Sequence, residues 1–196
     1  MPATSTKLRP DHPRVRNAIR VLAAEMRLHH RPTADHSHRL ARLARRVAEN
    51  MGLDPLCCTE VELVAVLHDV GKLAIDRRIL DHAGPLDDLQ RHIMRRHTIQ
   101  GEDILVMTAG LEHLGPIVRA THEWWDGCGY PDGLAGLEIP LEARIVSCAD
   151  AYDAMVNERS YRPAFTPREA ARRIDRDAGR QFDPVVAAAL LDLVRP

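Results

Sequence analysis

The chain is poor in aromatic residues, in lysine and in net charge. Only 4% of its 196 residues are aromatic, and 27 Lys and Arg stand against 28 Asp and Glu, which gives a formal net charge of −1. Because no overall field favours a polyanion, we expect neither DNA, RNA nor a membrane as a partner. Lysine occurs only at Lys7 and Lys72, so a lysine within a motif is unusual in this chain.

The chain also lacks the marks of exported and membrane-spanning proteins. Its 4 cysteines form no CxxC pair, and its first ten residues contain no apolar segment typical of a signal peptide. No apolar run approaches the ~18–20 residues that a membrane span requires. With 45% apolar residues, the chain can bury a core without disulfides. We therefore expect reduced thiols and a cytoplasmic protein.

Helical patterns recur, whereas strand-like alternation does not. Apolar residues follow a 3.6-residue period, and Asp54 with Pro55 is typical of a helix start. The sequence predicts an all-α bundle of seven or eight helices, with a flexible N-terminus at 1–12, an N-terminal helix at 13–31 and one domain at 32–196. Further helices are expected at 40–51, 55–70, 87–97, 116–124, 141–156 and 167–177 and from 184 onward, with an irregular Gly/Pro-rich loop at 126–140.

The end of the expected helix 55–70 carries a group of chemically active residues. His68, Asp69 and Lys72 follow one another closely enough to face one pocket. Neutral imidazole and carboxylate are metal ligands, one carboxylate can bridge two cations, and an ammonium can hold a phosphate oxygen. Taken alone, the same residues also fit an ordinary His–Asp pair on a solvated helix end.

Two further residues give this group a context. His36, then His68 with Asp69, then Asp150 form the order H…HD…D on three expected helices. With this pattern the chain resembles the HD phosphohydrolase superfamily and, more narrowly, HD-GYP domains. The segments that carry the resemblance are HSHRL at 36–40, LHDVGK at 67–72, HTIQG at 97–101, HEWWDGCGYPDGL at 122–134, IPLEARIVSCADAYDAM at 139–155, RSYR at 159–162 and QFDP at 181–184.

The resemblance implies an HD-type helical bundle around two divalent metal ions. Its pattern makes Asp69 the ligand that bridges the two ions, and mixed imidazole and carboxylate ligation suits iron or manganese. Such an ion pair activates water for attack on phosphorus. The implied ligands are His36, His68, Asp69 and Asp150 for the first ion, and Asp69 with His97 and His122 for the second.

The resemblance also implies residues that contact substrate. Lys72 acts with Asp69 in catalysis and holds a phosphate oxygen, while Tyr130, Arg159 and Arg162 face the substrate. Arginine suits this role because its planar guanidinium meets phosphate oxygens in pairs. The alternatives are that the two arginines form a solvated pair and that Tyr130 only caps its loop.

The sequence departs from the family pattern at two positions. Thr121 stands where the family has a second imidazole beside His122, which weakens the second metal site. Pro32 stands where some members have a Glu ligand for a third ion, so we expect no third ion. Trp124 and Trp125 are expected to anchor the adjacent loop to the core rather than to stack on bases.

The expected function is that of a metal-dependent phosphodiesterase. Its substrate would be a cyclic dinucleotide, most simply cyclic di-GMP, hydrolysed to linear pGpG with a further step to GMP left open. The alternative is a weak or inactive module that binds nucleotide or a partner; a general nucleotidase is disfavoured by the GYP loop. A separate regulatory or cyclase protein would supply control, and helix 13–31 either closes the core or pairs with a second copy in a homodimer.

Overall fold

The structure, a computed structural model, describes residues 12–158 and 163–195. Within these ranges it is helical, and its sole β-type pairing is an isolated bridge between Ala178 and Phe182, so the predicted all-α class is confirmed. The α-helices are α1 (Pro13–His29), α2 (Arg31–Asn50), α3 (Pro55–Leu67), α4 (Arg77–Leu80), α5 (Asp88–Arg95), α6 (His97–Val106), α7 (Gly115–Arg119), α8 (Leu141–Val156), α9 (Pro167–Asp177) and α10 (Pro184–Val194). Short 3-10 helices are η1 (Val70–Ala74), η2 (Glu112–Leu114), η3 (Ala120–His122) and η4 (Gly136–Glu138).

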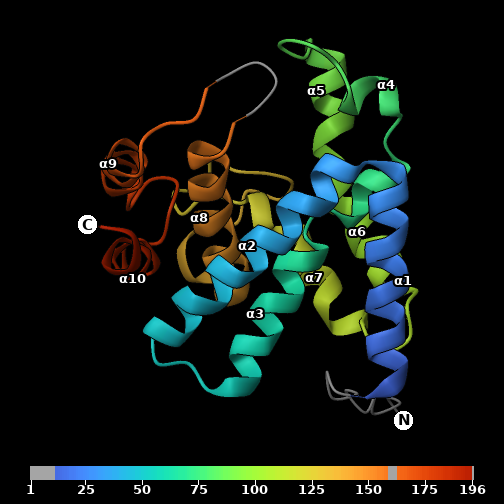
Figure 1. The fold of residues 1–196 in the computed structure, drawn as a ribbon, viewed down its shortest axis with the longest axis horizontal. Coiled ribbons are helices and arrows are strands. Elements are labelled where there is room, and N and C mark those ends of the chain that lie inside the picture. Colours follow the sequence, from blue (N-terminus) through green and yellow to red (C-terminus); the bar gives the residue numbers. More distant parts are fainter. Residues whose placement is uncertain (1–11, 159–162, 196) are drawn as a thin grey trace.

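Helix α2 is the central element of the bundle. It packs along α3 and against α8, while α9 and α10 cover α8 on the far side (Figure 1). Leu40 and Val47 of α2, Val64 of α3 and Val146 of α8 are fully buried in one hydrophobic cluster. Burial of such side chains stabilises the fold by about 1.5–3 kcal/mol each, so these three helices form a rigid frame.

The predicted helix starts are confirmed at several caps. The Asp54 carboxylate accepts hydrogen bonds from the amides of Leu56 and Cys57, at 2.9 and 3.2 Å. Capping boxes begin α5 at Asp87 and α9 at Thr166. These side chains satisfy amides that the first helical turn leaves without carbonyl partners.

Three predicted helix ends are wrong. The helix expected at 55–70 stops at Leu67, and the chain continues as the tighter η1. The helix expected at 87–97 ends at Arg95, and a separate helix, α6, begins at His97. The helix expected at 116–124 ends at Arg119 and passes into η3. Each break falls beside a predicted metal ligand, so local helix periodicity is overridden where the site is built.

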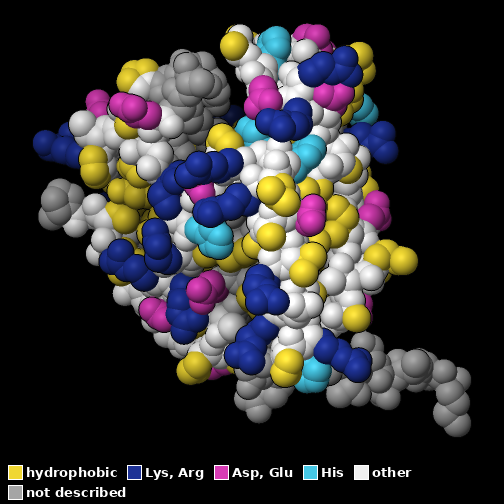
Figure 2. Space-filling model, turned by 45° about the vertical axis from the view of Figure 1, so that its right-hand side comes forward, with side chains coloured by type: hydrophobic (Ala, Val, Ile, Leu, Met, Phe, Trp, Pro, Cys, Tyr) yellow, Lys and Arg dark blue, Asp and Glu magenta, His cyan; other side chains and the backbone are white. Residues whose placement is uncertain are grey.

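Helix α1 packs across the N-terminal half of α2 and against η1. Its Val15 and Met26 are buried in the same cluster as α2 and α3, which supports the alternative that this helix closes the core. No described helix is long and apolar enough to cross a membrane. On the face that includes α1, Lys and Arg side chains recur with acidic and apolar ones among them (Figure 2).

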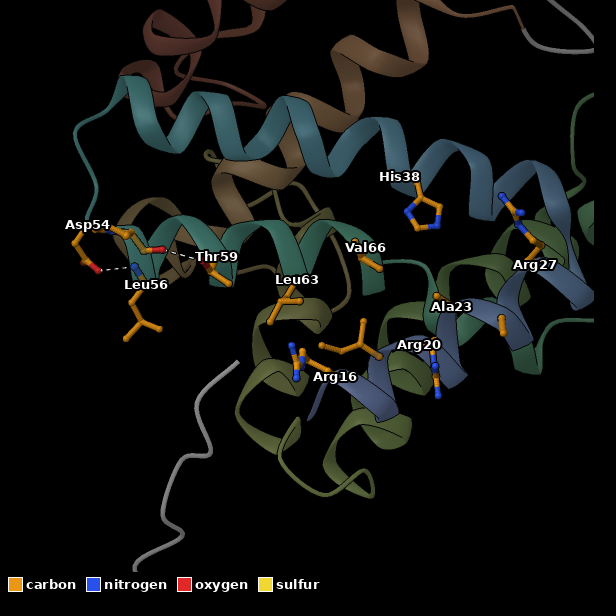
Figure 3. A pocket seen from close by; sticks show the side chains of 13 residues that line it. Arg16, Arg20, Ala23, Arg27, His38, Asp54, Leu56, Thr59, Leu63 and Val66 are labelled. Atoms are coloured by element: carbon orange, nitrogen blue, oxygen red, sulfur yellow. Dashed lines mark hydrogen bonds between the residues drawn. The ribbon is translucent and has the colours of Figure 1, made fainter. Parts of the chain in front are cut away.

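A hollow of about 1050 Å³ lies between α1 and α3 beneath α2 (Figure 3). Its walls include Ile19 and Ala23 of α1 and Leu63 of α3, and Arg16 and Arg20 also line it. The residues that line this hollow are different from the predicted metal ligands, so its size carries no information about the predicted chemistry.

Candidate metal centre

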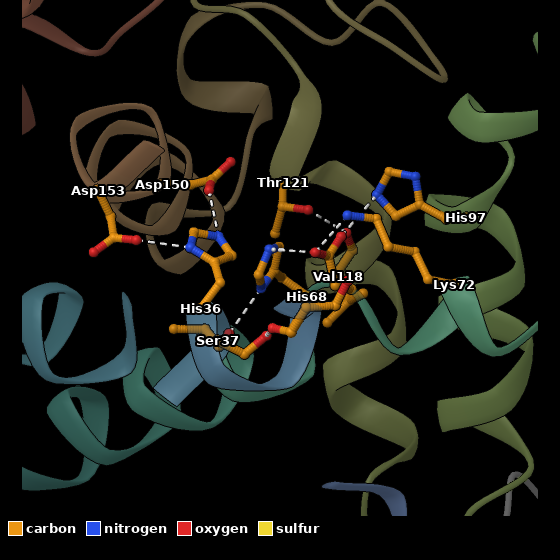
Figure 4. A network of polar contacts seen from close by, with 12 residues as sticks. His36, Ser37, His68, Lys72, His97, Val118, Thr121, Asp150 and Asp153 are labelled. Carbon is orange, nitrogen blue, oxygen red and sulfur yellow. Dashed lines mark hydrogen bonds and ion pairs between the residues drawn. The ribbon is translucent and has the colours of Figure 1, made fainter. Parts of the chain in front are cut away.

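The structure brings His36, His68 and Asp150 together. One nitrogen or oxygen atom from each lies within 4.8 Å of the others. His36 comes from α2, His68 directly follows α3, and Asp150 lies on α8 (Figure 4). The three helices that form the rigid frame therefore each contribute one side chain to this first group.

Asp69, His97 and His122 form a second group, whose ligand atoms also lie within 4.8 Å of one another. Asp69 lies between the two groups: its Oδ2 is 3.3 Å from Nε2 of His68, and its Oδ1 is 3.5 Å from Nε2 of His97. Its carboxylate therefore has one oxygen toward each group, which is the arrangement of a bridging ligand.

Gly71 explains how the two groups come so close. A side chain on Gly71 would overlap the carbonyl oxygen of His97 and crowd the amide of Gly101. The absence of a Cβ atom lets η1 lie directly against the first turn of α6. Asp69 and His97, at the starts of these two segments, are thereby held next to each other.

The hydrogen bonds of the imidazoles leave Nε2 atoms available. Nδ1 of His68 lies 2.8 Å from the carbonyl of Ala65, and Nδ1 of His97 lies 2.7 Å from that of Met94. A carbonyl can only accept, so Nδ1 of each ring donates a proton to it, and Nε2 is the nitrogen left to face Asp69. The ligating histidines of metal sites commonly make this kind of bond.

Two imidazole nitrogens of the second group are buried without a hydrogen bond. Nε2 of His97 and Nε2 of His122 have no such partner among the described residues. Burial lowers the pKa of His97 to about 3 and that of His122 to about 4, so both rings are neutral near pH 7. A buried, neutral imidazole nitrogen without a partner is costly unless it binds a cation. The second group therefore fits a divalent metal ion.

His36 lies between two carboxylates. Its Nε2 is 2.8 Å from Asp150 and its Nδ1 is 2.7 Å from Asp153. Burial alone would lower the pKa of His36, but the bonds to both carboxylates outweigh it and raise the pKa to about 9. Burial would raise the pKa of Asp150, but the hydrogen bond to His36 and the charge of that ring outweigh burial and lower the pKa below its usual range. Without a metal ion, His36 therefore holds a proton that an ion would have to displace.

Asp153 is a residue that our sequence reasoning missed. It is 6% exposed, and Nδ2 of Asn157 donates to its Oδ1 at 3.0 Å. A carboxylate on Nδ1 fixes a histidine so that Nε2 faces the ion. The available signal was its spacing: Asp153 follows Asp150 by three residues, which puts both on one face of α8.

Lys72 contacts the carboxylate of Asp69, which lies between the two groups. Its Nζ donates to Oδ2 of Asp69 at 2.6 Å, and the lysine side chain is 24% exposed. Burial would raise the pKa of Asp69, but His68 and Lys72 outweigh it and keep the pKa well below its usual range. The lysine side chain thus contacts the centre and is partly exposed.

The glycine-rich loop places Tyr130 against the second group. Its ring stacks on that of His122, with centroids 5.1 Å apart and planes at 10°. Oε1 of buried Glu123 accepts the amides of Asp132 and Gly133 at 2.7 and 3.1 Å, and this fixes the loop. Arg159 and Arg162, the other predicted substrate contacts, lie outside the described residues.

The tryptophans and Thr121 complete the surroundings. The amide of Trp125 donates to the carbonyl of Gln181, and the guanidinium of Arg180 lies 5.8 Å from the Trp124 ring. These contacts tie the loop to the C-terminal segment. Thr121 is 1% exposed, and its hydroxyl donates to the carbonyl of Val118 at 2.8 Å. The position where the family has a second imidazole is therefore buried and occupied by a hydroxyl that is already bonded.

Comparison with known proteins places this arrangement in a family. The HD domain family matches residues 20–186. A cyclic di-GMP phosphodiesterase of Thermotoga maritima is 40% identical over 163 residues, which cover 82% of this chain and 44% of that protein. The cyclic di-GMP phosphodiesterase response regulator RpfG of Xanthomonas campestris is 37% identical over 91% of this chain and 48% of its own length.

A solved structure gives the same result for the fold. The cyclic GMP-AMP-specific phosphodiesterase V-cGAP3 of Vibrio cholerae superimposes with a TM-score of 0.67 at 18% identity, over 90% of this chain and 48% of that one. The chain spans less than half the length of the two sequence relatives. The family match and the fold confirm the resemblance given by the sequence motifs: the chain belongs to the HD domain family.

Proposed function

We propose that this protein is a metal-dependent phosphodiesterase that hydrolyses cyclic di-GMP to linear pGpG. The observation that carries the proposal is the pair of histidine–carboxylate groups joined by Asp69. Two sequence relatives are named cyclic di-GMP phosphodiesterases. A centre of this composition suits a reaction in which water adds to phosphorus and the bond from phosphorus to O3′ breaks.

We assign six residues to the metal ions, for which iron or manganese suits the mixed ligation. When bound, two such ions supply Lewis acidity and activate water for attack on a phosphodiester. The remaining contributions come from the protein, which orients each imidazole and excludes competing ligands by burial. The assigned residues are His36, His68 and Asp150 for one ion, His97 and His122 for the other, and Asp69 for both.

Lys72, Tyr130, Arg159 and Arg162 would contact the substrate. The Lys72 ammonium at Asp69 can hold a non-bridging phosphate oxygen beside the reacting phosphorus. Tyr130 would form a wall of the pocket through its stack on His122. Arg159 and Arg162 would bind phosphate, so alanine at either should raise KM more than it lowers kcat.

The binding-module alternative rests on Thr121, which removes one imidazole from the second group. Hydrolysis is favoured over it because the remaining residues of both groups converge and because the relatives are named as enzymes. The same proposal includes a cytoplasmic location, a homodimer and a separate regulatory or cyclase partner. It also includes recognition of a related cyclic dinucleotide and a further hydrolysis step to GMP.

Substitution of the shared carboxylate tests the proposal. Asp69→Asn keeps the side-chain volume but removes the charge that both groups use. We expect its metal content to fall from two ions toward zero and pGpG formation to stop, while the helical circular dichroism signal persists. Turnover at the wild-type rate in this variant would refute a metal mechanism.

A further inference from the structure

One cationic side chain beside the centre has no acidic partner in the part of the chain that the structure describes. The guanidinium carbon of Arg95, the last residue of α5, lies 4.9 Å from the ring centre of Tyr130. The side chain of Arg95 makes no ion pair with a described carboxylate. Arg91, one turn earlier on the same helix, instead pairs with Asp88 at 3.2 Å. The five N–H donors of Arg95 therefore remain available to another molecule.

Arg95 is held at a defined place by the ring beneath it. Tyr130 has the guanidinium near it and stacks on His122 at 5.1 Å. The Tyr130 amide donates to the carbonyl of His122 at 3.1 Å, so ring and backbone are both fixed against the second group. A cation over an aromatic ring is attracted to it by about 0.5–1 kcal/mol at an exposed site. Arg95 is thus more ordered than a free surface arginine.

The stack also limits how far Arg95 stands from the centre. The guanidinium carbon lies 4.9 Å from the Tyr130 ring centre, which lies 5.1 Å from that of His122. The distance from the guanidinium carbon to the His122 ring centre therefore cannot exceed the sum of these two distances. Lys72, by contrast, lies directly on Asp69 at 2.6 Å. Lys72 is therefore a cation at the reacting position, and Arg95 is a further described cation one aromatic ring away.

A cyclic dinucleotide has two phosphodiesters, each with one negative charge, and only one of them can occupy the centre during cleavage. The other needs a cation outside the metal groups. We propose that Arg95 binds this second, uncleaved phosphate through paired N–H contacts, and so selects cyclic dinucleotides over substrates with a single phosphodiester. The inference rests on the proposed function and names the group that recognises the far side of its substrate.

The test compares Arg95→Ala and Arg95→Lys with Arg91→Ala as a matched control on the same helix. Binding of cyclic di-GMP is measured by calorimetry on metal-free protein, and hydrolysis is measured with cyclic di-GMP and with bis(p-nitrophenyl) phosphate, which has one phosphodiester. Arg95→Ala should weaken cyclic di-GMP binding and raise its KM about tenfold, because a charged hydrogen bond is lost. Its kcat, its metal content and its activity on the small ester should stay unchanged.

Arg95→Lys should recover part of the affinity, and Arg91→Ala should behave as wild type. Unchanged cyclic di-GMP affinity in Arg95→Ala would overturn the inference. Equal losses on both esters would also overturn it, because they would mean that Arg95 acts by positioning Tyr130 and His122. If metal-loaded wild type hydrolyses neither ester, the proposed function fails while the calorimetric comparison still decides the role of Arg95. If wild type neither binds nor hydrolyses cyclic di-GMP, both fail.

Discussion

Gly71→Ala is expected to disrupt the second histidine–carboxylate group while leaving the first in place. Its Cβ would overlap the backbone of His97, and a backbone carbonyl cannot rotate away as a side chain can. Side-chain Cβ atoms stay beyond 3.0 Å from such neighbours. Helix α6 would therefore have to retreat from η1 by about 1 Å or more, whereas metal–ligand distances tolerate only about 0.2 Å.

The cost can be estimated from this overlap. Forcing extra atoms into a packed interior costs about 1–3 kcal/mol, and for a chain of this size each kcal/mol lowers Tm by about 2–4 °C. We therefore expect Tm to fall by between about 2 and 12 °C. Gly101→Ala is the control: it lies inside α6, where Ala is favoured over Gly, and its Cβ would meet Cγ1 of Val118 at 3.1 Å, a side-chain atom that can shift.

The assay combines thermal unfolding with metal analysis. Gly71→Ala should bind one divalent ion per chain instead of two and form no pGpG, and Gly101→Ala should match wild type within about 2 °C. If Gly71→Ala binds two ions and unfolds at the wild-type temperature, the close approach of η1 and α6 does not build the centre, and the reasoning is refuted.

Three further predictions concern the surroundings of the ligands. Thr121→His should raise occupancy of the second ion and any slow phosphodiesterase rate together; a rise in occupancy alone, seen by metal analysis, would favour the binding-module alternative. Asp153→Asn should lower metal affinity about 10–100-fold, because His36 loses the carboxylate that orients it; unchanged affinity by calorimetry would contradict this. Since His36 with its pKa near 9 is protonated in the metal-free protein, affinity at its site should rise about tenfold per pH unit from pH 7 to 9. A flat profile would mean that His36 is not a ligand.

Much of the fold was predictable because local signals agree with it. These signals act over a few residues and can be recognised in the sequence. They are the Asp54 cap, the capping boxes at Asp87 and Thr166 and the apolar periodicity of α2. The breaks after Leu67 and at Arg96 cannot be recognised there, because they depend on contact between segments far apart in the chain. Where η1 meets α6, tertiary packing decides the backbone.

The same division holds for the candidate site. The residues that converge were predicted from motifs, and the structure brings all six described ligand candidates into two adjacent groups. The spacing of Asp153 from Asp150 puts both on one face of α8, but the contacts of Asp153 with His36 and of Arg95 with Tyr130 join segments far apart in the chain and appear only in the structure. Residues that act on a ligand or on a ring, rather than on an ion, are therefore the ones that sequence reasoning misses.

Anaerobic reconstitution followed by a turnover assay tests the central claim most directly. Wild-type protein is loaded with iron or with manganese, metal content is measured, and the products from cyclic di-GMP are separated by chromatography alongside those from Asp69→Asn. The account predicts linear pGpG from metal-loaded wild type and none from the metal-free protein or from the variant. Formation of pGpG by metal-free protein, or its absence from wild type carrying two ions per chain, would contradict the account.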